Sequence, residues 1–228
     1  MTQMKCVYCD EGEASTVDHI PPKCLFAKPR PSNLITVPCC EPCNSKFSPD
    51  DEYFRTAMAF RWDVSQHPSS GPIHAAALRS ISRSVASKFS ELFTKSVESA
   101  PLITPSGLYL GEGGRFECDM TRIYAVVARI VRGLHYKKTG VPLPQSRGVM
   151  VLDNESLEQF APLQRGEILK SMAPMLQGRP EVFGDENFLF FWRKSQNNVD
   201  SEWFLVFFSY VIFLGVTGDA AEIGRAAA

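Results

Sequence analysis

Two pairs of cysteines near the N-terminus have the spacing of metal-binding knuckles. Six of the chain's seven cysteines lie between Cys6 and Cys43. Cys6-Val7-Tyr8-Cys9 and Cys40-Glu41-Pro42-Cys43 each place two thiols three positions apart, and four thiolates from two such pairs can surround one zinc ion tetrahedrally. We therefore expect a structural Zn²⁺ held by four side chains: Cys6, Cys9, Cys40 and Cys43.

The remaining cysteines leave alternatives open. A single C-x-x-C can be a redox pair, although two in a small Pro-rich module favour zinc. Cys39 could take the place of Cys40, but only Cys40 keeps the spacing to Cys43. Cys24 has no partner at ligand spacing, and we expect a small buried apolar residue there.

An acidic residue and a histidine stand side by side between the cysteine pairs. Asp18 and His19 follow a predicted short strand, and Pro21 and Pro22 close the segment. A carboxylate can bind a divalent ion, and a histidine with a pKa near neutrality can act as general base toward a water. The pair indicates metal-assisted hydrolysis of a phosphodiester.

Together these motifs resemble the HNH nuclease family, whose ββα-metal finger carries an Asp-His pair at the end of its first strand. The resemblance covers residues 4–55 and includes Asn33-Leu34-Ile35-Thr36-Val37, followed by Cys40-x-x-Cys43-Asn44. It implies that this part folds as a small zinc-stabilised ββα-metal (HNH, treble-clef-like) finger. The residues that follow are expected to form a larger α+β domain of unassigned fold.

The resemblance also implies roles for particular residues. His19 would be the general base, Asn33 would orient it, and Asp18 with Asn44 would hold one Mg²⁺ or Mn²⁺ distinct from the zinc. The implied activity is that of a DNA endonuclease, a hydrolase that leaves 5′-phosphate ends. Two departures stand out: Asn44 takes a position where many members have His, and the glycine pair that usually follows the Asp-His is absent.

An acidic cluster follows the second cysteine pair. Asp50, Asp51 and Glu52 either complete the coordination of the divalent ion or form the solvated start of a helix. Residues 47–54 are expected to form a turn capped by Ser48 or Asp50, followed by a helix.

The turn-forming segment Gln66–Pro72 predicts a boundary between a finger of residues 1–65 and an α+β domain of residues 73–228. Apolar periodicity there predicts helices over 74–97, 121–138 and 156–176. Short strands are expected within 104–120 and over 148–152. The aromatic runs 188–192 and 203–214 predict two antiparallel strands.

The net charge and the positions of the basic residues limit how the chain can bind DNA. The 24 basic and 25 acidic residues give a net charge of −1, so binding to DNA must be local. On the predicted helix over 121–138, Arg122, Arg129 and Arg132 lie opposite the apolar stripe, where they either contact phosphates or form a solvated face. With Lys23 and Lys46 they are our candidate contacts to double-stranded DNA. A homodimer is expected because two nicks need two active sites.

Composition frames these expectations. With 44% hydrophobic and 21% charged residues the chain is an ordinary globular one. The sequence shows no signal peptide and no apolar run of membrane-spanning length, so we expect a cytoplasmic protein without membrane contact. Two other hypotheses stay open: a non-catalytic zinc finger that binds nucleic acid or protein, and a C-terminal domain that regulates the nuclease, as in bacterial defence.

Overall fold

The computed structural model describes residues 4–9, 11–83, 97–104, 106–195, 197 and 199–226. As expected, the fold is a mixed α+β one. The strands are β1 (Thr16–Ile20), β2 (Ile35–Cys39), β3 (Glu98–Ile103), β4 (Tyr109–Arg115), β5 (Arg147–Leu152), β6 (Glu181–Phe183), β7 (Phe188–Lys194), β8 (Ser201–Phe207) and β9 (Val211–Asp219). The helices are α1 (Glu41–Ala59), α2 (Trp62–Ser65), α3 (Ser70–Arg83), α5 (Met120–Thr139), α6 (Asn154–Glu158), α7 (Pro162–Met172) and α8 (Ala220–Ala226), with 3₁₀ turns at Lys23–Leu25 and Met175–Gln177.

A hairpin and a helix form the N-terminal unit. β1 pairs with β2 antiparallel, with Asp18 opposite Val37, and α1 follows directly after β2. In β1, Asp18 and Ile20 are buried while Val17 is exposed, as alternation along a strand requires. The turn predicted within residues 47–54 is wrong, because α1 runs unbroken through Pro49.

The C-terminal part contains a five-stranded antiparallel sheet of order β5-β9-β8-β7-β6. Alternate residues of β8 face the main core, and Phe204 faces a second cluster that includes Leu157 of α6 and Met172 of α7. The single strand predicted over 203–214 is wrong. It is a hairpin that turns at Phe208 and Ser209, both of which have positive φ.

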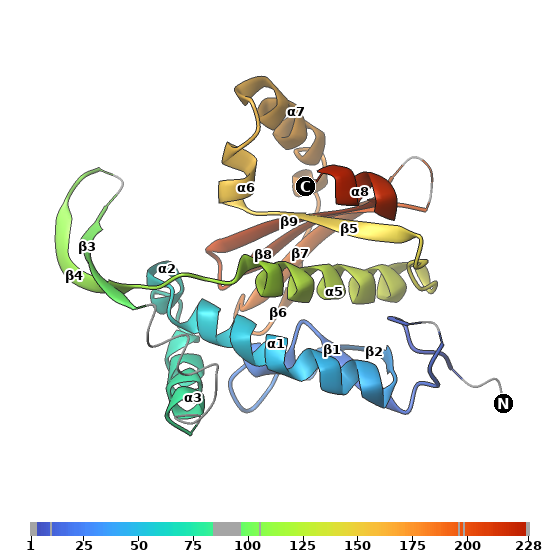
Figure 1. Ribbon diagram of the computed structural model, residues 1–228, viewed down its shortest axis with the longest axis horizontal. Helices are drawn as coiled ribbons and strands as arrows, with labels where there is room; N and C mark the ends of the chain where they lie inside the picture. The colour runs from blue at the N-terminus through green and yellow to red at the C-terminus, as the bar shows by residue number, and fades with distance from the viewer. Residues whose placement is uncertain are drawn as a thin grey trace.

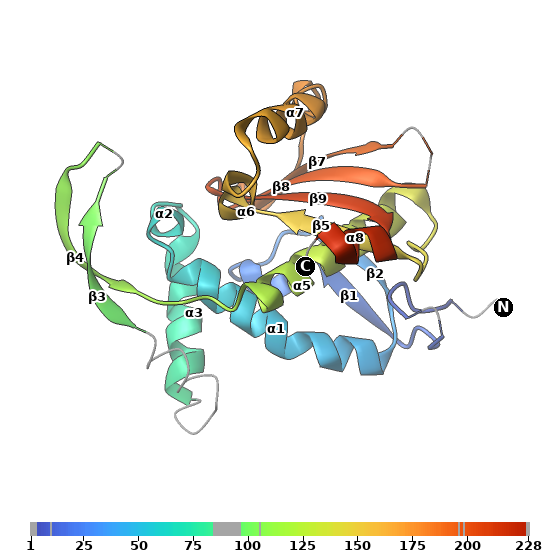
Figure 2. The ribbon, with the colours of Figure 1, turned by 45° about the horizontal axis from the view of Figure 1, so that its top comes forward.

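Helix α5 lies between this sheet and the N-terminal unit (Figures 1 and 2). Asp119 caps its N-terminus by accepting hydrogen bonds from the amides of Thr121 and Arg122, and Gly140 ends it in the left-handed conformation with φ 76°. The helix predicted over 121–138 is therefore confirmed, and it ends at Gly140.

The other predicted elements differ in length. The helix predicted over 74–97 is α3, which begins earlier at Ser70, and residues 84–96 lie outside the described part. The helix predicted over 156–176 is two helices, α6 and α7, followed by a 3₁₀ turn. The strands expected in 104–120 include β4, which pairs with β3 in a hairpin that extends away from the body (Figure 1).

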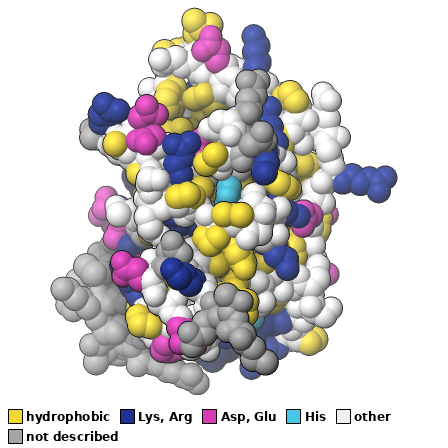
Figure 3. Space-filling model, turned by 90° about the vertical axis from the view of Figure 1, so that its right-hand side faces the viewer, with side chains coloured by type: hydrophobic (Ala, Val, Ile, Leu, Met, Phe, Trp, Pro, Cys, Tyr) yellow, Lys and Arg dark blue, Asp and Glu magenta, His cyan; other side chains and the backbone are white. Residues whose placement is uncertain are grey.

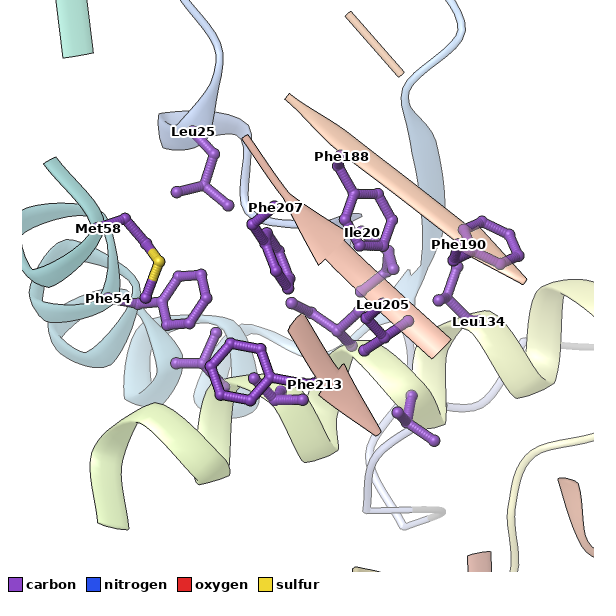
Figure 4. Packing of buried hydrophobic residues seen from close by; sticks show 14 of the residues in the cluster. Ile20, Leu25, Phe54, Met58, Leu134, Phe188, Phe190, Leu205, Phe207 and Phe213 are labelled. Carbon is purple, nitrogen blue, oxygen red and sulfur yellow. The ribbon is translucent and has the colours of Figure 1, made fainter. Parts of the chain in front are cut away.

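One hydrophobic core joins residues on both sides of the predicted boundary at Gln66–Pro72. Side chains from β1 and α1 meet side chains from α5, β7, β8 and β9 in a single cluster (Figure 4). Phe54 of α1 packs edge-on against Phe207 of β8, with ring centroids 5.3 Å apart. The N-terminal unit is thus packed onto the C-terminal sheet and helix rather than standing apart from them.

Candidate metal centre and adjoining cavity

The four cysteines that the spacing singled out come together. The Sγ atoms of Cys6, Cys9, Cys40 and Cys43 all lie within 4.8 Å of one another. Such a cluster of four sulfur ligands is consistent with structural zinc. Cys40 is the N-cap of α1 and Cys43 lies in its first turn, so the partial positive charge of the helix N-terminus faces the thiols.

The backbone around the cluster is shaped for sulfur ligands. The amides of Tyr8 and Gly12 donate to Cys6 Sγ at 3.5 Å and to Cys9 Sγ at 3.4 Å. A Cβ at Gly12 would lie 2.9 Å from Cys40 Cβ, so only glycine lets the turn close over this thiol. Burial and the neighbouring thiols raise the pKa of Cys43, a cost that a cation bound by the sulfurs would remove.

The remaining cysteines lie outside the cluster. Cys39 is fully buried and its thiol contacts the carbonyl of Cys40, so Cys40 is the cluster member, as its spacing predicted. The Cys24 thiol contacts the carbonyl of Asp51 at 3.5 Å, and burial raises its pKa to about 12. Cys24 is thus a largely buried neutral thiol.

A cavity of about 220 Å³ lies between β1 and α1. Three of the four residues assigned chemical roles from the sequence, Asp18, His19 and Asn44, contribute to its wall. The other lining residues are Val17, Pro22, Lys23, Glu41, Ser45, Ser48 and Asp51. Residues 18 and 44 are far apart in sequence, and the strand-helix packing brings them to one site.

The carboxylate of Asp18 is held in place by Tyr8 and Arg129. Its side chain is only 5% exposed, and Oδ2 accepts a hydrogen bond of 2.7 Å from the hydroxyl of Tyr8. Oδ2 also lies 3.7 Å from Nε of Arg129, which comes from α5. In the described part of the chain nothing donates a hydrogen bond to Oδ1, so this oxygen is available to a ligand in the cavity.

His19 has the properties of a neutral base. Its side chain is half-buried, and in the described part of the chain no hydrogen bond holds its imidazole. Burial lowers its pKa below the usual 6.5, the positive charges of Lys23 and Arg30 lower it further, and Asp18 opposes the shift. The imidazole is therefore unprotonated at neutral pH and able to accept a proton.

One face of α1 forms the opposite wall. Asn44, Ser48 and Asp51 recur at intervals of four and three residues, which places them on the same side of the helix. The amide of Asn44 donates to Thr16 Oγ1 at 3.2 Å, which leaves its side-chain oxygen available to the cavity. Burial raises the pKa of Asp51 to about 6 against the opposing charge of Arg129.

The three residues of the acidic cluster after the cysteines contact different parts of the protein. Only Asp51 lines the cavity. Asp50 pairs with Arg122 at 2.6 Å, and Glu52 lies 3.5 Å from Arg55. Of the two alternatives left open by the sequence, a role beside the divalent ion is compatible with Asp51 alone.

Two candidate residues lie elsewhere. Asn33 is outside the cavity, and its amide donates to the carbonyl of Val182 on β6 at 3.3 Å. The predicted contact between Asn33 and His19 is absent among the described hydrogen bonds. Lys23 lines the cavity, whereas Lys46 is exposed on α1 and is not part of its wall.

The three arginines of α5 are engaged within the protein. The expectation of an exposed face is wrong for Arg129, whose side chain is 5% exposed and pairs with Asp51. Arg122 contacts Asp50 and the carbonyl of Pro49, and Arg132 contacts the carbonyls of Leu143 and Arg147. Each of the three contacts at least one acceptor of the chain itself, because α5 is covered on two sides.

Sequence reasoning passed over Tyr8, assigned Arg129 to DNA rather than to this site, and placed Ser48 only as a helix cap. The signal for Ser48 and Asp51 was their helical spacing from Asn44. No local signal marks Tyr8 or Arg129, since their contacts to Asp18 depend on packing between distant segments.

Comparison with known proteins assigns the chain to no family. No protein-family model, no curated protein and no solved structure matches the chain. In the described part of the chain, no helix combines the length and hydropathy needed to cross a bilayer.

Proposed function

We propose that the cavity between β1 and α1 is the active site of a metal-dependent endonuclease of the HNH type, which hydrolyses DNA phosphodiester bonds. The observation that carries this proposal is the convergence of Asp18, His19 and Asn44 on one cavity beside the four-cysteine cluster. A binding finger needs only the cysteines. It has no use for a neutral histidine facing a cavity that also holds a carboxylate and an amide.

Each residue has a task in this proposal. Asp18 Oδ1 and the side-chain oxygen of Asn44 are hard ligands suited to Mg²⁺ or Mn²⁺, which, when bound, polarises the scissile phosphate and stabilises the departing 3′ oxygen. The imidazole of His19 takes a proton from the attacking water, and its lowered pKa keeps it ready to do so. Lys23, on the cavity wall, supplies positive charge for the phosphate.

DNA must be drawn to the cavity by local charge. The chain is nearly neutral, and on the face shown in Figure 3 cations, acids and apolar side chains are interspersed. Because the arginines of α5 are already paired, Lys23 and the exposed Lys46 are the better candidates for phosphate contacts.

The test is cleavage of supercoiled plasmid by zinc-loaded full-length protein with Mg²⁺ or Mn²⁺. We expect His19→Ala to lower the cleavage rate by at least 100-fold, on the order of a lost general base, and excess chelator to abolish cleavage. His74→Ala is the matched control, because His74 is an exposed histidine of α3 that contacts Phe60 outside the cavity.

The outcomes separate the two main hypotheses. Cleavage that survives in His19→Ala would exclude this site as its source. If the wild type binds plasmid with zinc at one equivalent but does not cut it with any divalent ion, the chain is either the non-catalytic finger or a nuclease that its C-terminal part holds inactive. Ends that a ligase can rejoin directly would show the 5′-phosphate product.

A further inference from the structure

Arg129 lies where a buried cation meets two carboxylates. It projects from α5 toward two residues of the cavity wall: its Nη2 pairs with Oδ1 of Asp51, and its Nε lies 3.7 Å from Oδ2 of Asp18. Its guanidinium also stacks on the ring of Phe47, with Cζ 4.5 Å from the centroid. One positive charge thus sits between two acids of the cavity wall.

The hydrogen bonding of the Arg129 guanidinium is incomplete. Its side chain is 5% exposed, yet among the described residues Nε and Nη1 have no hydrogen-bond partner. An unsatisfied buried guanidinium is costly, so packing alone does not account for it. Arg132 on the next turn shows the ordinary arrangement, in which both terminal nitrogens donate to backbone carbonyls.

The charges decide what Arg129 does to a cation in the cavity. Without it, Asp18 and Asp51 would be a pair of close carboxylates in a poorly solvated pocket, which attracts a divalent ion strongly. The guanidinium neutralises one of the two charges and repels any second cation at short range. It also holds Asp51 through Oδ1 and so keeps that oxygen away from the cavity.

We propose that Arg129 is the resident counter-cation of the Asp18–Asp51 pair. It is a positioning residue that keeps Asp18 directed into the cavity and holds the affinity for the divalent ion low enough for exchange during turnover. The inference deepens the proposed nuclease function, and it implies that the site is completed by α5, a helix outside the N-terminal unit.

The experiment is titration of zinc-loaded full-length protein with Mn²⁺ at pH 8, followed by calorimetry. We expect Arg129→Met to bind Mn²⁺ at least tenfold more tightly than wild type and to cleave plasmid more slowly. Arg129→Lys keeps the charge, and Arg132→Met removes an equivalent arginine of the same helix, so both should bind Mn²⁺ within about twofold of wild type. Adding Asp18→Asn to Arg129→Met should abolish the gain.

The opposite results overturn the inference. A merely structural arginine would lower both metal affinity and cleavage when removed, and unchanged or weaker Mn²⁺ binding by Arg129→Met contradicts the proposal. So does the absence of binding in both proteins. Binding by Arg129→Met alone supports it, and in that case the wild-type nuclease activity is judged separately by the His19→Ala comparison.

A second variant covers the case in which Arg129→Met does not fold. Asp51→Asn leaves the guanidinium facing Asp18 alone, so we expect Mn²⁺ to bind at least tenfold more weakly than to wild type. Asp51 is 21% exposed at its side chain, and an amide can still accept from Arg129. Unchanged Mn²⁺ binding by Asp51→Asn would overturn the inference.

Discussion

Tyr8 joins the cysteine cluster to the cavity. It lies between Cys6 and Cys9, and its hydroxyl donates to Oδ2 of Asp18 at 2.7 Å. Its ring packs edge-on against Phe47, 5.0 Å between centroids, and its carbonyl accepts from the amide of Gln145. The loop that binds the proposed zinc therefore also fixes the carboxylate of the proposed active site.

Replacing Tyr8 tests this link. Tyr8→Phe keeps the ring but removes the only hydrogen bond described for the buried carboxylate of Asp18, so we expect the free energy of unfolding to fall by about 1.5–3 kcal/mol. Zinc content should stay at one equivalent. Urea unfolding and a zinc assay measure the two effects.

Tyr210→Phe is the control for Tyr8→Phe. Tyr210 is 46% exposed, and no hydrogen bond of its hydroxyl is described. Its replacement should change stability by less than about 0.5 kcal/mol. Equal losses in the two variants would show that the hydroxyl of Tyr8 does not stabilise Asp18.

Single residues were predictable where spacing alone carries the information. The choice of Cys40 over Cys39 followed from the distance to Cys43, and the cluster confirms it. The prediction that Arg129 lies on an exposed face was wrong, because that face was assigned from the apolar stripe of its own helix alone. That face is polar in sequence and buried in the structure, covered by α1 and β1.

At the scale of elements, the contact between α5 and β1 brings Arg129 to Asp18. It depends on Gly133, where a Cβ would lie 2.7 Å from Cγ1 and Cδ1 of Ile20. Glycine inside a helix costs about 1 kcal/mol relative to alanine. The chain accepts that cost because glycine lets the helix and the strand approach closely.

Gly133→Ala should therefore destabilise the protein by about 1–3 kcal/mol, since overpacking against Ile20 outweighs the gain in helix propensity. Gly166→Ala in α7 is the matched control, because nothing lies within 4 Å of a Cβ there. We expect that variant to be up to about 1 kcal/mol more stable. Thermal unfolding of both variants decides, and a stabilised Gly133→Ala would contradict the close packing.

Elements were predictable where their ends carry local signals. The apolar periodicity over 121–138 predicted α5 correctly, and Asp119 and Gly140 cap its two ends, because capping is a property of a few adjacent residues. The turn between β8 and β9 was missed because Phe208 and Ser209 adopt positive φ without glycine or asparagine to announce it. The turn predicted at Ser48 or Asp50 is absent, because α1 continues through these residues and through Pro49.

At the scale of the whole molecule, one core serves both the N-terminal unit and the C-terminal sheet. Ile20 and Phe54 belong to the same cluster as Phe207 and Phe213 (Figure 4). Such a shared core could not be read from the sequence, where the turn formers at 66–72 are a local signal and say nothing about packing between distant residues.

Loss of zinc should consequently destabilise strands that lie far from the cysteines. We expect Cys43→Ser, or treatment with a strong chelator, to speed hydrogen exchange in β8 and β9 together with β1 and β2, because binding energy at a structural zinc site contributes to folding. Cys118→Ser, at a cysteine outside the cluster, should leave exchange unchanged. Faster exchange confined to β1 and β2 would show that the N-terminal unit unfolds by itself.

Helix α1 fixes the spacing between the cysteine cluster, the cavity and the hydrophobic core. Cys43 belongs to the cysteine cluster, Asn44 and Asp51 face the cavity, and Phe54 fills the core, all on one continuous helix. One residue inserted between Cys43 and Phe54 would rotate everything beyond it by about 100° and shift it by about 1.5 Å. Descendants of this sequence are therefore free to gain or lose residues in the loops around α1, while the interval from Cys43 to Phe54 must keep its length.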